Sequence, residues 1–174
     1  MRIRPATPDD AAGINAVRNA SWQGAYGAHL PDGYWAGYDS AAATARFAAM
    51  ISAGRTRVLV AQAERIVGFV FFGANRDEDL PAAVAEIYAI YVHPDAWSTG
   101  AGRALMDAAL AALGDVPVVL WVLTANERAR RFYARAGFVL DGAEKEAEMP
   151  GGNLPELRYR RALVAVEGGR QPEQ

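Results

Sequence analysis

The sequence predicts a mixed α/β domain, and three observations lead to that prediction. The chain has 174 residues, a length typical of one domain with a substantial core. Apolar and β-branched segments in its middle have the length of strands, and they alternate with helical segments further along. An alanine-rich helical region precedes them. We expect one domain over residues 1–166, followed by a flexible polar tail at 167–174.

The first third of the chain is predicted to be mostly helical behind one strand. The strand covers Arg2–Ala6, and Thr7 then caps a helix that has proline at its first position. Glycines and prolines interrupt an aromatic stretch from Trp22 to Tyr38, which predicts short helices and loops. The alanine-rich segment Ser40–Ala53 is expected to form a helix that ends at a glycine.

The remaining elements alternate between strands and helices. Two apolar segments, Val58–Ala63 and Ile66–Phe72, are separated by two residues and predict a β-hairpin. A charged loop over Ala74–Pro81 precedes a third strand. That strand and the later elements are expected at Val84–Val92 (strand), Gly100–Leu113 (helix), Val118–Leu123 (strand), Asn126–Ala136 (helix), Phe138–Asp141 (strand) and Leu157–Val164 (strand).

Composition argues against several classes of function. Hydrophobic residues make up 52% and charged residues 22% of the chain, and no apolar run approaches the roughly 20 residues of a membrane span. We expect no secretory signal. Because there is no cysteine, disulfides and thiolate chemistry are excluded. A net charge of −2 argues against a nucleic-acid binder, and no cluster has metal-ligand spacing. We expect a cytoplasmic protein that binds no metal, membrane or nucleic acid.

The first candidate site is a strand that runs into a glycine turn and a helix. Gly100 and Gly102 open the predicted helix after the strand ends at Pro94. Unpaired N–H groups at a helix start bind anions, and glycines let a phosphate approach the backbone. The segment has neither the Gly-Lys-Ser/Thr of a P-loop nor the third glycine and distal acid of a dinucleotide site. Glycines that only tighten a turn are the alternative.

The second candidate site is the helix that begins near Asn126. Thr124 and Glu127 have the spacing of a capping box. Asn126 and Tyr133 are seven residues apart, about two helical turns, so they share a face of the helix. A capped amphipathic helix with a buried tyrosine is the structural alternative, and spacing alone favours it.

These two segments resemble the two signatures of the GCN5-related N-acetyltransferase (GNAT) superfamily. Trp97–Gly102 is similar to the coenzyme motif Gln/Arg-x-x-Gly-x-Gly/Ala, and Asn126–Phe138 is similar to Asn-x-x-Ala-x-x-Phe-Tyr-x-x-x-Gly-Phe. Two residues depart from the first motif, since Trp97 replaces Gln or Arg and Ser98 replaces a frequent glycine. The likeness covers about residues 2–165. It implies the GNAT acyl-CoA N-acyltransferase fold, a central twisted mixed β-sheet flanked by helices.

The resemblance implies acetyl-CoA as the co-substrate. In the family, the asparagine at Asn126 contacts the coenzyme and the tyrosine at Tyr133 protonates the departing thiolate. A phenol has a pKa of about 10 and a thiol about 8.5, so the phenol can protonate or stabilise a thiolate. Four arginines between residues 128 and 135 give this helix a positive charge that suits phosphates. The residues expected to contact the coenzyme are Ile90, Tyr91, Val92, Trp97, Ser98, Thr99, Gly100, Ala101, Gly102, Arg103, Asn126, Ala129, Phe132 and Tyr133.

Glu86 is the candidate general base. Strand alternation predicts that it shares a face with Tyr88, Ile90 and Val92. Apolar neighbours disfavour the charged form of a carboxylate, which suits a base that removes a proton from an amine. In some family members a glutamate eleven residues before the glycine motif has this role, and Glu86 stands at that distance. A solvent-exposed glutamate at a strand end is the alternative, and His29 is a second candidate base.

The resemblance implies that the acceptor binds between the N-terminal helices and the last hairpin. Trp22, Tyr26 and Glu86 are the candidate substrate-binding residues, and a loop over Glu144–Pro155 would complete the pocket. Acidic residues in that loop and at Asp77–Asp79 would attract a cationic amine. We expect a small-molecule amine or a peptide N-terminus as acceptor, and we leave a homodimer open.

The sequence therefore predicts an acetyl-CoA-dependent N-acetyltransferase that acts on a primary amine. The attack is expected to be direct, because no cysteine can carry an acyl group. A non-catalytic acyl-CoA-binding or regulatory module with the same fold is the alternative. The departures at Trp97 and Ser98 favour the module, whereas Glu86, Asn126 and Tyr133 favour the enzyme.

Overall fold

The computed structural model describes residues 1–26, 35–149 and 152–162 of the chain. Of the sequence-based predictions, those on His29, on the tail at 167–174 and on the end of the last strand at Val164 lie outside the described residues. The side chain of Tyr26 lies outside them as well.

The N-terminal region has the predicted strand and helices, but its first helix continues unbroken to Tyr26, through the start of the stretch that was expected to be interrupted. Strand β1 (Arg2–Pro5) leads to Thr7, which caps a short 3-10 helix over Pro8–Asp10 that continues into α1 (Ala11–Tyr26). The carboxylate of Asp10 accepts a hydrogen bond from the Thr7 backbone N–H at 2.8 Å. Helix α2 (Ser40–Ala53) has the predicted bounds. An aspartate caps its start, and a glycine in the left-handed conformation ends it.

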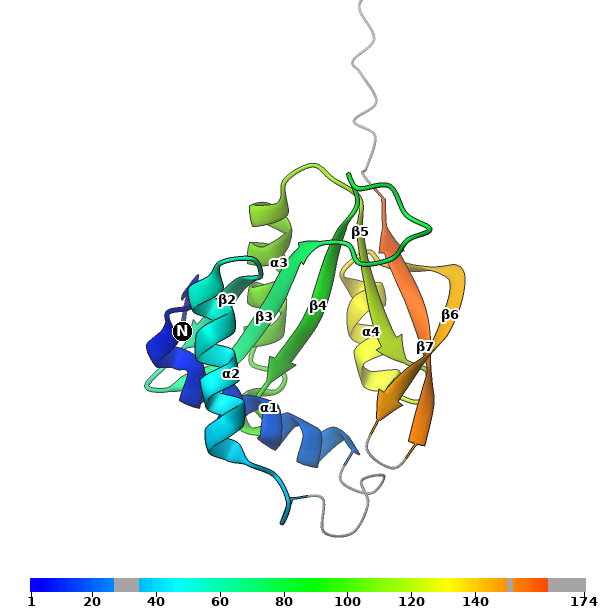
Figure 1. Cartoon of the computed structure of the whole chain (residues 1–174). Coiled ribbons are helices and arrows are strands. Elements are labelled where there is room, and N and C mark those ends of the chain that lie inside the picture. The colour runs from blue at the N-terminus through cyan, green and yellow to red at the C-terminus, as the bar shows by residue number, and fades with distance from the viewer. Residues whose placement is uncertain (27–34, 150–151, 163–174) are drawn as a thin grey trace, which may run out of the picture.

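Among the described residues, seven strands form one mixed sheet in the order β1-β2-β3-β4-β5-β7-β6 (Figure 1). All neighbouring strands are antiparallel except β4 and β5, which are parallel and are joined through a helix. The prediction of a mixed α/β domain is therefore confirmed. The strands that follow β1 are β2 (Arg57–Gln62), β3 (Ile66–Ala74), β4 (Ala85–Val92), β5 (Val118–Leu123), β6 (Val139–Met149) and β7 (Gly152–Arg161).

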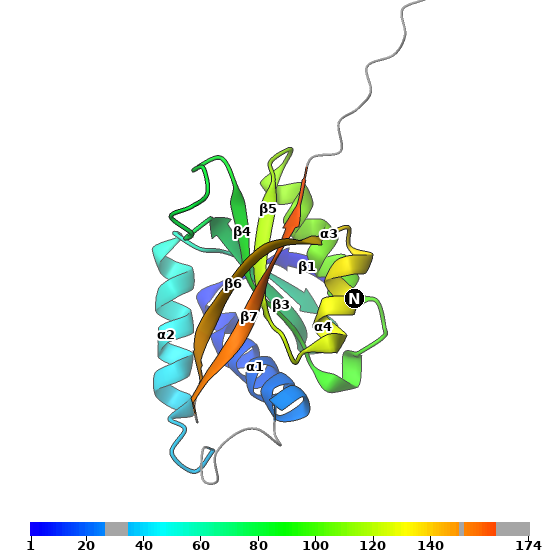
Figure 2. The same ribbon diagram turned by 90° about the vertical axis from the view of Figure 1, so that its right-hand side faces the viewer.

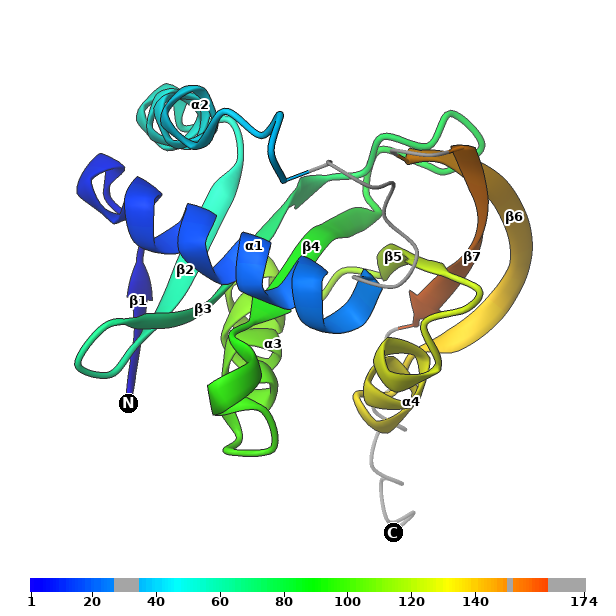
Figure 3. The same cartoon turned by 90° about the horizontal axis from the view of Figure 1, so that it is seen from below.

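Helices cover both faces of the sheet, as Figure 3 shows. Helices α1 and α2 lie on one face, where apolar side chains such as Ile14 pack against Phe69 and Phe71 of β3. Helices α3 (Ala101–Leu113) and α4 (Glu127–Arg135) lie on the other face, where the larger core cluster forms around Leu105 and Phe138. The molecule thus has three layers, and each face of the sheet has its own core.

Strands β4 and β5 pair over only three residues and then separate. The pairs are Ala85 with Val118, Glu86 with Val119, and Ile87 with Leu120. Beyond these pairs, no strand of the described chain lies against the β5-facing edge of β4 at residues 88–92. A strand edge without a partner presents unpaired N–H and C=O groups. The sheet therefore has a gap between β4 and β5, and this gap connects its two helix-covered faces.

A β-bulge in β4 changes the predicted face of Glu86. Pairing with β3 shifts from Ala89 directly to Ile87, which leaves Tyr88 as the extra residue. Because the bulge interrupts the alternation, Ile90 packs with Ile87 on the α3–α4 face, whereas Tyr88 packs on the α1–α2 face. Glu86 precedes Ile87 and faces the α1–α2 side. The prediction that Glu86 shares a face with Ile90 and Val92 was therefore wrong.

The last two strands are longer than predicted. Strands β6 and β7 form a long hairpin (Figure 2), and most of the loop expected over Glu144–Pro155 belongs to these strands. Polar and charged side chains alternate along this hairpin, and many of them are exposed. An apolar alternation, the usual sign of a strand, is therefore missing at this end of the sheet.

Candidate active site

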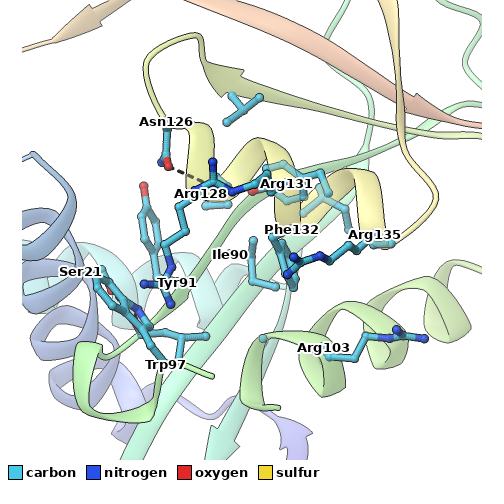
Figure 4. A pocket seen from close by; sticks show the side chains of 18 of the residues that line it. Ser21, Ile90, Tyr91, Trp97, Arg103, Asn126, Arg128, Arg131, Phe132 and Arg135 are labelled. Atoms are coloured by element: carbon cyan, nitrogen blue, oxygen red, sulfur yellow. Dashed lines mark hydrogen bonds between the residues drawn. The ribbon is translucent and has the colours of Figure 1, made fainter. Parts of the chain in front are cut away.

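A cavity of about 610 Å³ opens where β4 and β5 separate (Figure 4). Such a volume lies within the usual range for small-molecule sites. Its walls come from α1, β4, β5, β7, α4, the start of α3 and the turn before it. Of the predicted site residues, Thr99, Ala101 and Glu86 do not line it. Those that do are Trp22, Ile90, Tyr91, Val92, Trp97, Ser98, Gly100, Gly102, Arg103, Asn126, Ala129, Phe132 and Tyr133.

The N-terminus of α3 faces this cavity with the backbone of its glycine turn. Gly100 caps the helix at φ 90°, and Ser98 also has a positive φ, of 63°. These left-handed residues shape the turn whose N–H groups have no partner inside the helix. A Cβ added at Gly102 would lie 3.5 Å from the Phe132 ring, which is an ordinary contact, so this position would accept a small side chain. The turn therefore has the form of an anion-binding cradle.

Trp97 has a structural role in this turn. Its indole Nε1 donates a hydrogen bond to the Val92 carbonyl at 2.8 Å, and Ser21 of α1 donates to the same oxygen at 2.8 Å. The guanidinium of Arg128 lies over the Trp97 ring at 3.8 Å from its centroid, and Figure 4 shows the two side chains meeting. Trp97 thus ties the turn to β4 and supports an arginine of α4 by a cation–π contact.

Arginines gather at this end of the cavity. Arg103 of α3 and Arg128, Arg131 and Arg135 of α4 all line it. Arg103 and Arg131 also form exposed ion pairs with acids four residues away on the same helix. Exposed pairs of this kind are weak, so their arginines can turn to another anion at little cost. The α3–α4 side of the cavity is therefore suited to a ligand with several phosphates.

Asn126 caps α4 at the rim of the cavity. Its Oδ1 accepts a hydrogen bond from the Ala129 backbone N–H at 3.0 Å, and the helix begins at Glu127. The predicted capping box from Thr124 to Glu127 was therefore wrong, because a turn separates Thr124 from the helix. Among the described residues, the buried Thr124 hydroxyl has no hydrogen-bond partner.

Tyr133 belongs both to the core and to the cavity wall. It is 7% exposed, and its ring packs against Phe132, Phe138 and Tyr159 at centroid distances of 5.4, 6.2 and 6.5 Å. It reaches the cavity from the α3–α4 face. The packing fixes the position of the ring, which a group acting on a bound ligand requires.

Glu86 is buried and paired with an arginine. The residue is 1% exposed, and its two carboxylate oxygens accept hydrogen bonds from Arg76, one from Nη2 at 2.5 Å and the other from Nε at 3.1 Å. The backbone N–H of Arg76 donates a third bond at 3.0 Å. The expectation of apolar surroundings was therefore wrong, because the loop after β3 brings Arg76 back to this strand, a long-range contact that no local pattern indicates.

The α1–α2 side of the cavity has aromatic walls. Trp22, Tyr88, Tyr91 and Trp121 line it. The Trp22 indole N–H donates a hydrogen bond to the Tyr91 hydroxyl at 3.2 Å. Burial raises the pKa of Tyr91, which stays a neutral phenol at physiological pH. This wall offers ring faces and neutral hydroxyls to a ligand.

Glu156 of β7 also lines the cavity, and the sequence analysis missed it. It stands opposite Leu123 of β5 and Lys145 of β6 in the sheet. Burial raises the pKa of its carboxyl group. Glu156 lies between the predicted loop, which ends at Pro155, and the predicted strand, which begins at Leu157, so no strand pattern indicated the direction of its side chain.

The acidic loop between β3 and β4 is neutralised by a buried arginine. Arg158 of β7 donates hydrogen bonds to Asp79 at 2.7 and 2.8 Å and to Asp77 at 3.2 Å, and it binds Asp141 at 2.7 Å. Trp121 Nε1 also donates to Asp77, at 2.9 Å. The expectation that this loop attracts a cation was wrong for these two aspartates, because Arg158 already occupies them.

Metal-binding clusters and membrane-spanning helices are both absent from the described residues. No group of three or more histidine, cysteine, aspartate or glutamate side chains within the described ranges could hold a metal ion. Within the same ranges, no helix has both the length and the apolar character needed to cross a membrane.

The sequence is similar to known acetyltransferases. An uncharacterized N-acetyltransferase of Mycobacterium tuberculosis is 36% identical over 108 residues, which are 60% of this chain and 66% of that protein. A mycothiol acetyltransferase of Acidimicrobium ferrooxidans is 38% identical over 87 residues, 48% of this chain and 28% of that protein. The chain thus matches slightly less than two thirds of the first relative and much less of the second.

The chain also resembles a solved acetyltransferase structure in fold, and it matches the model of a protein family. The crystal structure of the PaiA N-acetyltransferase from Thermoplasma acidophilum in complex with coenzyme A has a TM-score of 0.67 at 19% identity, over 92% of this chain and 98% of that one. This likeness shows a common fold. The model of the acetyltransferase (GNAT) family matches residues 14–138, which is most of the chain. This chain therefore belongs to the GNAT family of acetyltransferases.

Proposed function

We propose that the protein is an acetyl-CoA-dependent N-acetyltransferase that acetylates a primary amine by direct attack. The main observation behind the proposal is that the cavity passes through the sheet and is open to both of its faces. It joins an arginine-lined side at α3 and α4 to an aromatic side that also holds a carboxylate. A phosphate-bearing donor and a cationic acceptor would thus meet in the gap between β4 and β5.

The donor side of the cavity fits the coenzyme. The turn around Gly100 and the arginines of α4 would bind its phosphates. The edge of β4 at residues 88–92 pairs with no strand, and apart from the Val92 carbonyl, which Trp97 and Ser21 occupy, it would hydrogen-bond to an extended chain that carries amides. Acetyl-CoA supplies the acetyl group as a thioester. The relative in complex with coenzyme A and the names of the acetyltransferase relatives support this choice of donor.

Tyr133 is proposed as the acid that protonates the departing thiolate. Its ring is fixed by the core, and it faces the cavity from the same side as α4. The role of Glu86 as a base remains a prediction. Because Arg76 holds both of its oxygens, Glu86 would act through a water molecule or through a change in this ion pair.

A non-catalytic acyl-CoA-binding module is the second candidate. The observation that favours it is the ion pair between Glu86 and Arg76, which engages the predicted base in a structural contact. The module would bind the coenzyme on the same surface but would lack turnover. A homodimer and a cytoplasmic location stay predictions under either function.

Release of the coenzyme thiol separates the two candidates. Acetyl-CoA is incubated with the protein and a panel of amines: 1,4-diaminobutane, butylamine, alanylalanine and an amino sugar. Calorimetry on the same protein measures the dissociation constant of CoA. Thiol release with at least one amine, together with CoA binding, supports the enzyme. Tight CoA binding with no release above the protein-free rate for any amine favours the module.

A further inference from the structure

We propose that Glu156 binds the ammonium group of the acceptor and takes its proton, an inference that rests on the proposed N-acetyltransferase function. The residue lies on β7, in the part of the hairpin that borders the cavity. From the sequence, Glu86 was expected to have this role. The structure gives the two carboxylates very different surroundings, and that difference carries the proposal.

Register places Glu156 on the side of the sheet opposite to Tyr133. Glu156 stands across from Leu123 of β5, and residues directly opposite in a sheet share a face. The next residue, Leu157, packs with Tyr133 in the α3–α4 core, so Glu156 faces the α1–α2 side. An acceptor held by Glu156 would therefore meet the donor from the side opposite to the proposed acid.

Glu156 is the carboxylate with unused hydrogen-bonding capacity. Both oxygens of Glu86 accept hydrogen bonds from Arg76, and Glu86 does not line the cavity. Glu156 lines the cavity, and within the described part of the chain its side chain forms no hydrogen bond or ion pair. A half-buried carboxylate without a partner is costly to keep charged, so a cationic ligand at this position would be bound with favourable energy.

The walls around Glu156 favour a cation. The rings of Trp22 and Trp121 line the same cavity. Each already has a cation over its face, Arg18 at 4.3 Å from the Trp22 centroid and Lys145 at 4.0 Å from the Trp121 centroid. Ring faces that attract these side chains would also attract an alkylammonium group. The site therefore combines a carboxylate with aromatic faces, a suitable environment for a primary ammonium.

Charged groups from several elements set the protonation of Glu156. Burial has the largest effect and raises its pKa, and the negative charge of Glu86 on β4 acts in the same direction. Lys145 on β6 and Arg76 in the loop after β3 lower the pKa. Tyr91 on β4 is neutral and is itself affected by the charge of Glu156. Because burial dominates, the carboxylate is a stronger base than an exposed glutamate, which helps it accept a proton near neutral pH.

The proton balance of the reaction assigns each residue one task. An alkylammonium loses two protons when it becomes an amide. Glu156 accepts the first proton and passes it to solvent, and the neutral amine then forms the C–N bond while the C–S bond breaks. Tyr133 protonates the thiolate, and the second amine proton restores the phenol. No oxidation or reduction takes place.

Binding of a simple amine tests the site without turnover. Butylamine is titrated calorimetrically into the protein saturated with CoA, with butanol as the uncharged control ligand. We expect Glu156→Gln to weaken butylamine binding by about tenfold or more and to leave butanol unchanged. The distant exposed Glu64→Gln is the control and should stay within about twofold of the parent. Glu86→Gln tests the rival carboxylate and should lose less butylamine affinity than Glu156→Gln. Equal butylamine affinity for Glu156→Gln and the parent, or a larger loss in Glu86→Gln, overturns the proposal.

The pH dependence of turnover tests the proton transfer. With butylamine or alanylalanine as acceptor, Glu156→Gln should lose most activity at low pH and recover as the pH approaches the pKa of the acceptor amine. Recovery should begin at lower pH for the α-amine of alanylalanine, whose pKa is about 8, than for butylamine. A constant loss at every pH contradicts the role as base. If the parent acetylates no amine while butylamine binding still depends on Glu156, the proposed function fails and the ammonium site stands.

Discussion

The two ends of the cavity are built in different ways. The end proposed to bind the donor, here the donor end, lies at α3 and α4 and consists of backbone groups and arginines from two continuous segments of the chain. The end proposed to bind the acceptor, here the acceptor end, brings together single side chains from α1, β4, β5 and β7. A phosphate can be bound by any correctly shaped backbone turn, whereas an acceptor is recognised by particular side chains. The donor end can therefore be shared across a family while the acceptor end differs between its members.

Arg158 does not line the cavity, but it binds Asp77, which accepts a hydrogen bond from Trp121 of the acceptor end. Replacing it in Arg158→Met leaves Asp77 and Asp141 without their cation, and we expect a loss of about 3 kcal/mol in the free energy of unfolding. Arg65→Met, which removes an ion pair that is exposed on both sides, should cost less than about 1 kcal/mol. Urea unfolding measures both. Equal losses would contradict the special role of Arg158, and an unchanged CoA affinity of the folded Arg158→Met protein would show that the two ends are independent.

A substitution at Tyr133 tests the proposed protonation of the thiolate, at the point where the two ends of the cavity meet. Tyr133→Phe keeps the packed ring but removes the proposed acid, so kcat should fall by about a hundredfold while CoA affinity stays the same. Tyr159→Phe is the matched control, because its hydroxyl accepts a hydrogen bond from Arg130 and it does not line the cavity. Steady-state and single-turnover rates give the answer. An unaltered single-turnover rate in Tyr133→Phe would remove the residue from the mechanism.

Substitutions at the two glycines that flank α3 distinguish an effect on coenzyme binding from an effect of backbone strain. Gly100 and Gly114 have φ values of 90° and 78°, and a Cβ at either position meets no atom within 4 Å. Alanine at either site should therefore cost about 1 kcal/mol of stability. Only Gly100→Ala places a methyl group where the phosphates would approach, so only this variant should weaken CoA binding, by roughly tenfold. Calorimetry that finds the same CoA affinity for both variants would contradict the proposed cradle.

Arg128 should have the smallest effect of the four. Arg128→Gln removes one charge from the donor end and the cation–π contact to Trp97, and CoA affinity should fall by about three- to tenfold. The effect should shrink at high salt, because exposed charges are screened. Arg46→Gln, an exposed change on α2, is the control and should leave the affinity unchanged. A loss that does not depend on salt would indicate that Arg128 acts through packing.

The donor end could be predicted from the sequence because it is local. Gly100 and Gly102 follow a strand, and Asn126 and Tyr133 share one helix, so spacing along the chain indicated their arrangement. The bounds of β5 were also predicted to the residue, because a run of apolar residues has clear limits along the chain. The resemblance to the GNAT signatures added the family.

The acceptor end could not be predicted because it depends on long-range contacts. A single bulge at Tyr88 reversed the face of Ile90 relative to Glu86, and alternation gives no warning of such a bulge. The pairing of Arg76 with Glu86 and of Arg158 with the loop after β3 joins segments that have no local pattern in common. Glu156 was missed because the β6–β7 hairpin is largely polar and exposed.

The central claim is that the open edge of β4 and the start of α3 bind the coenzyme. Amide hydrogen exchange with and without CoA tests it most directly, because bound amides exchange more slowly. The account predicts protection of residues 88–92 and 100–103 on adding CoA, with little change in β6 and β7. Protection confined to the β6–β7 hairpin, or none at residues 88–92 and 100–103 at saturating CoA, would contradict it.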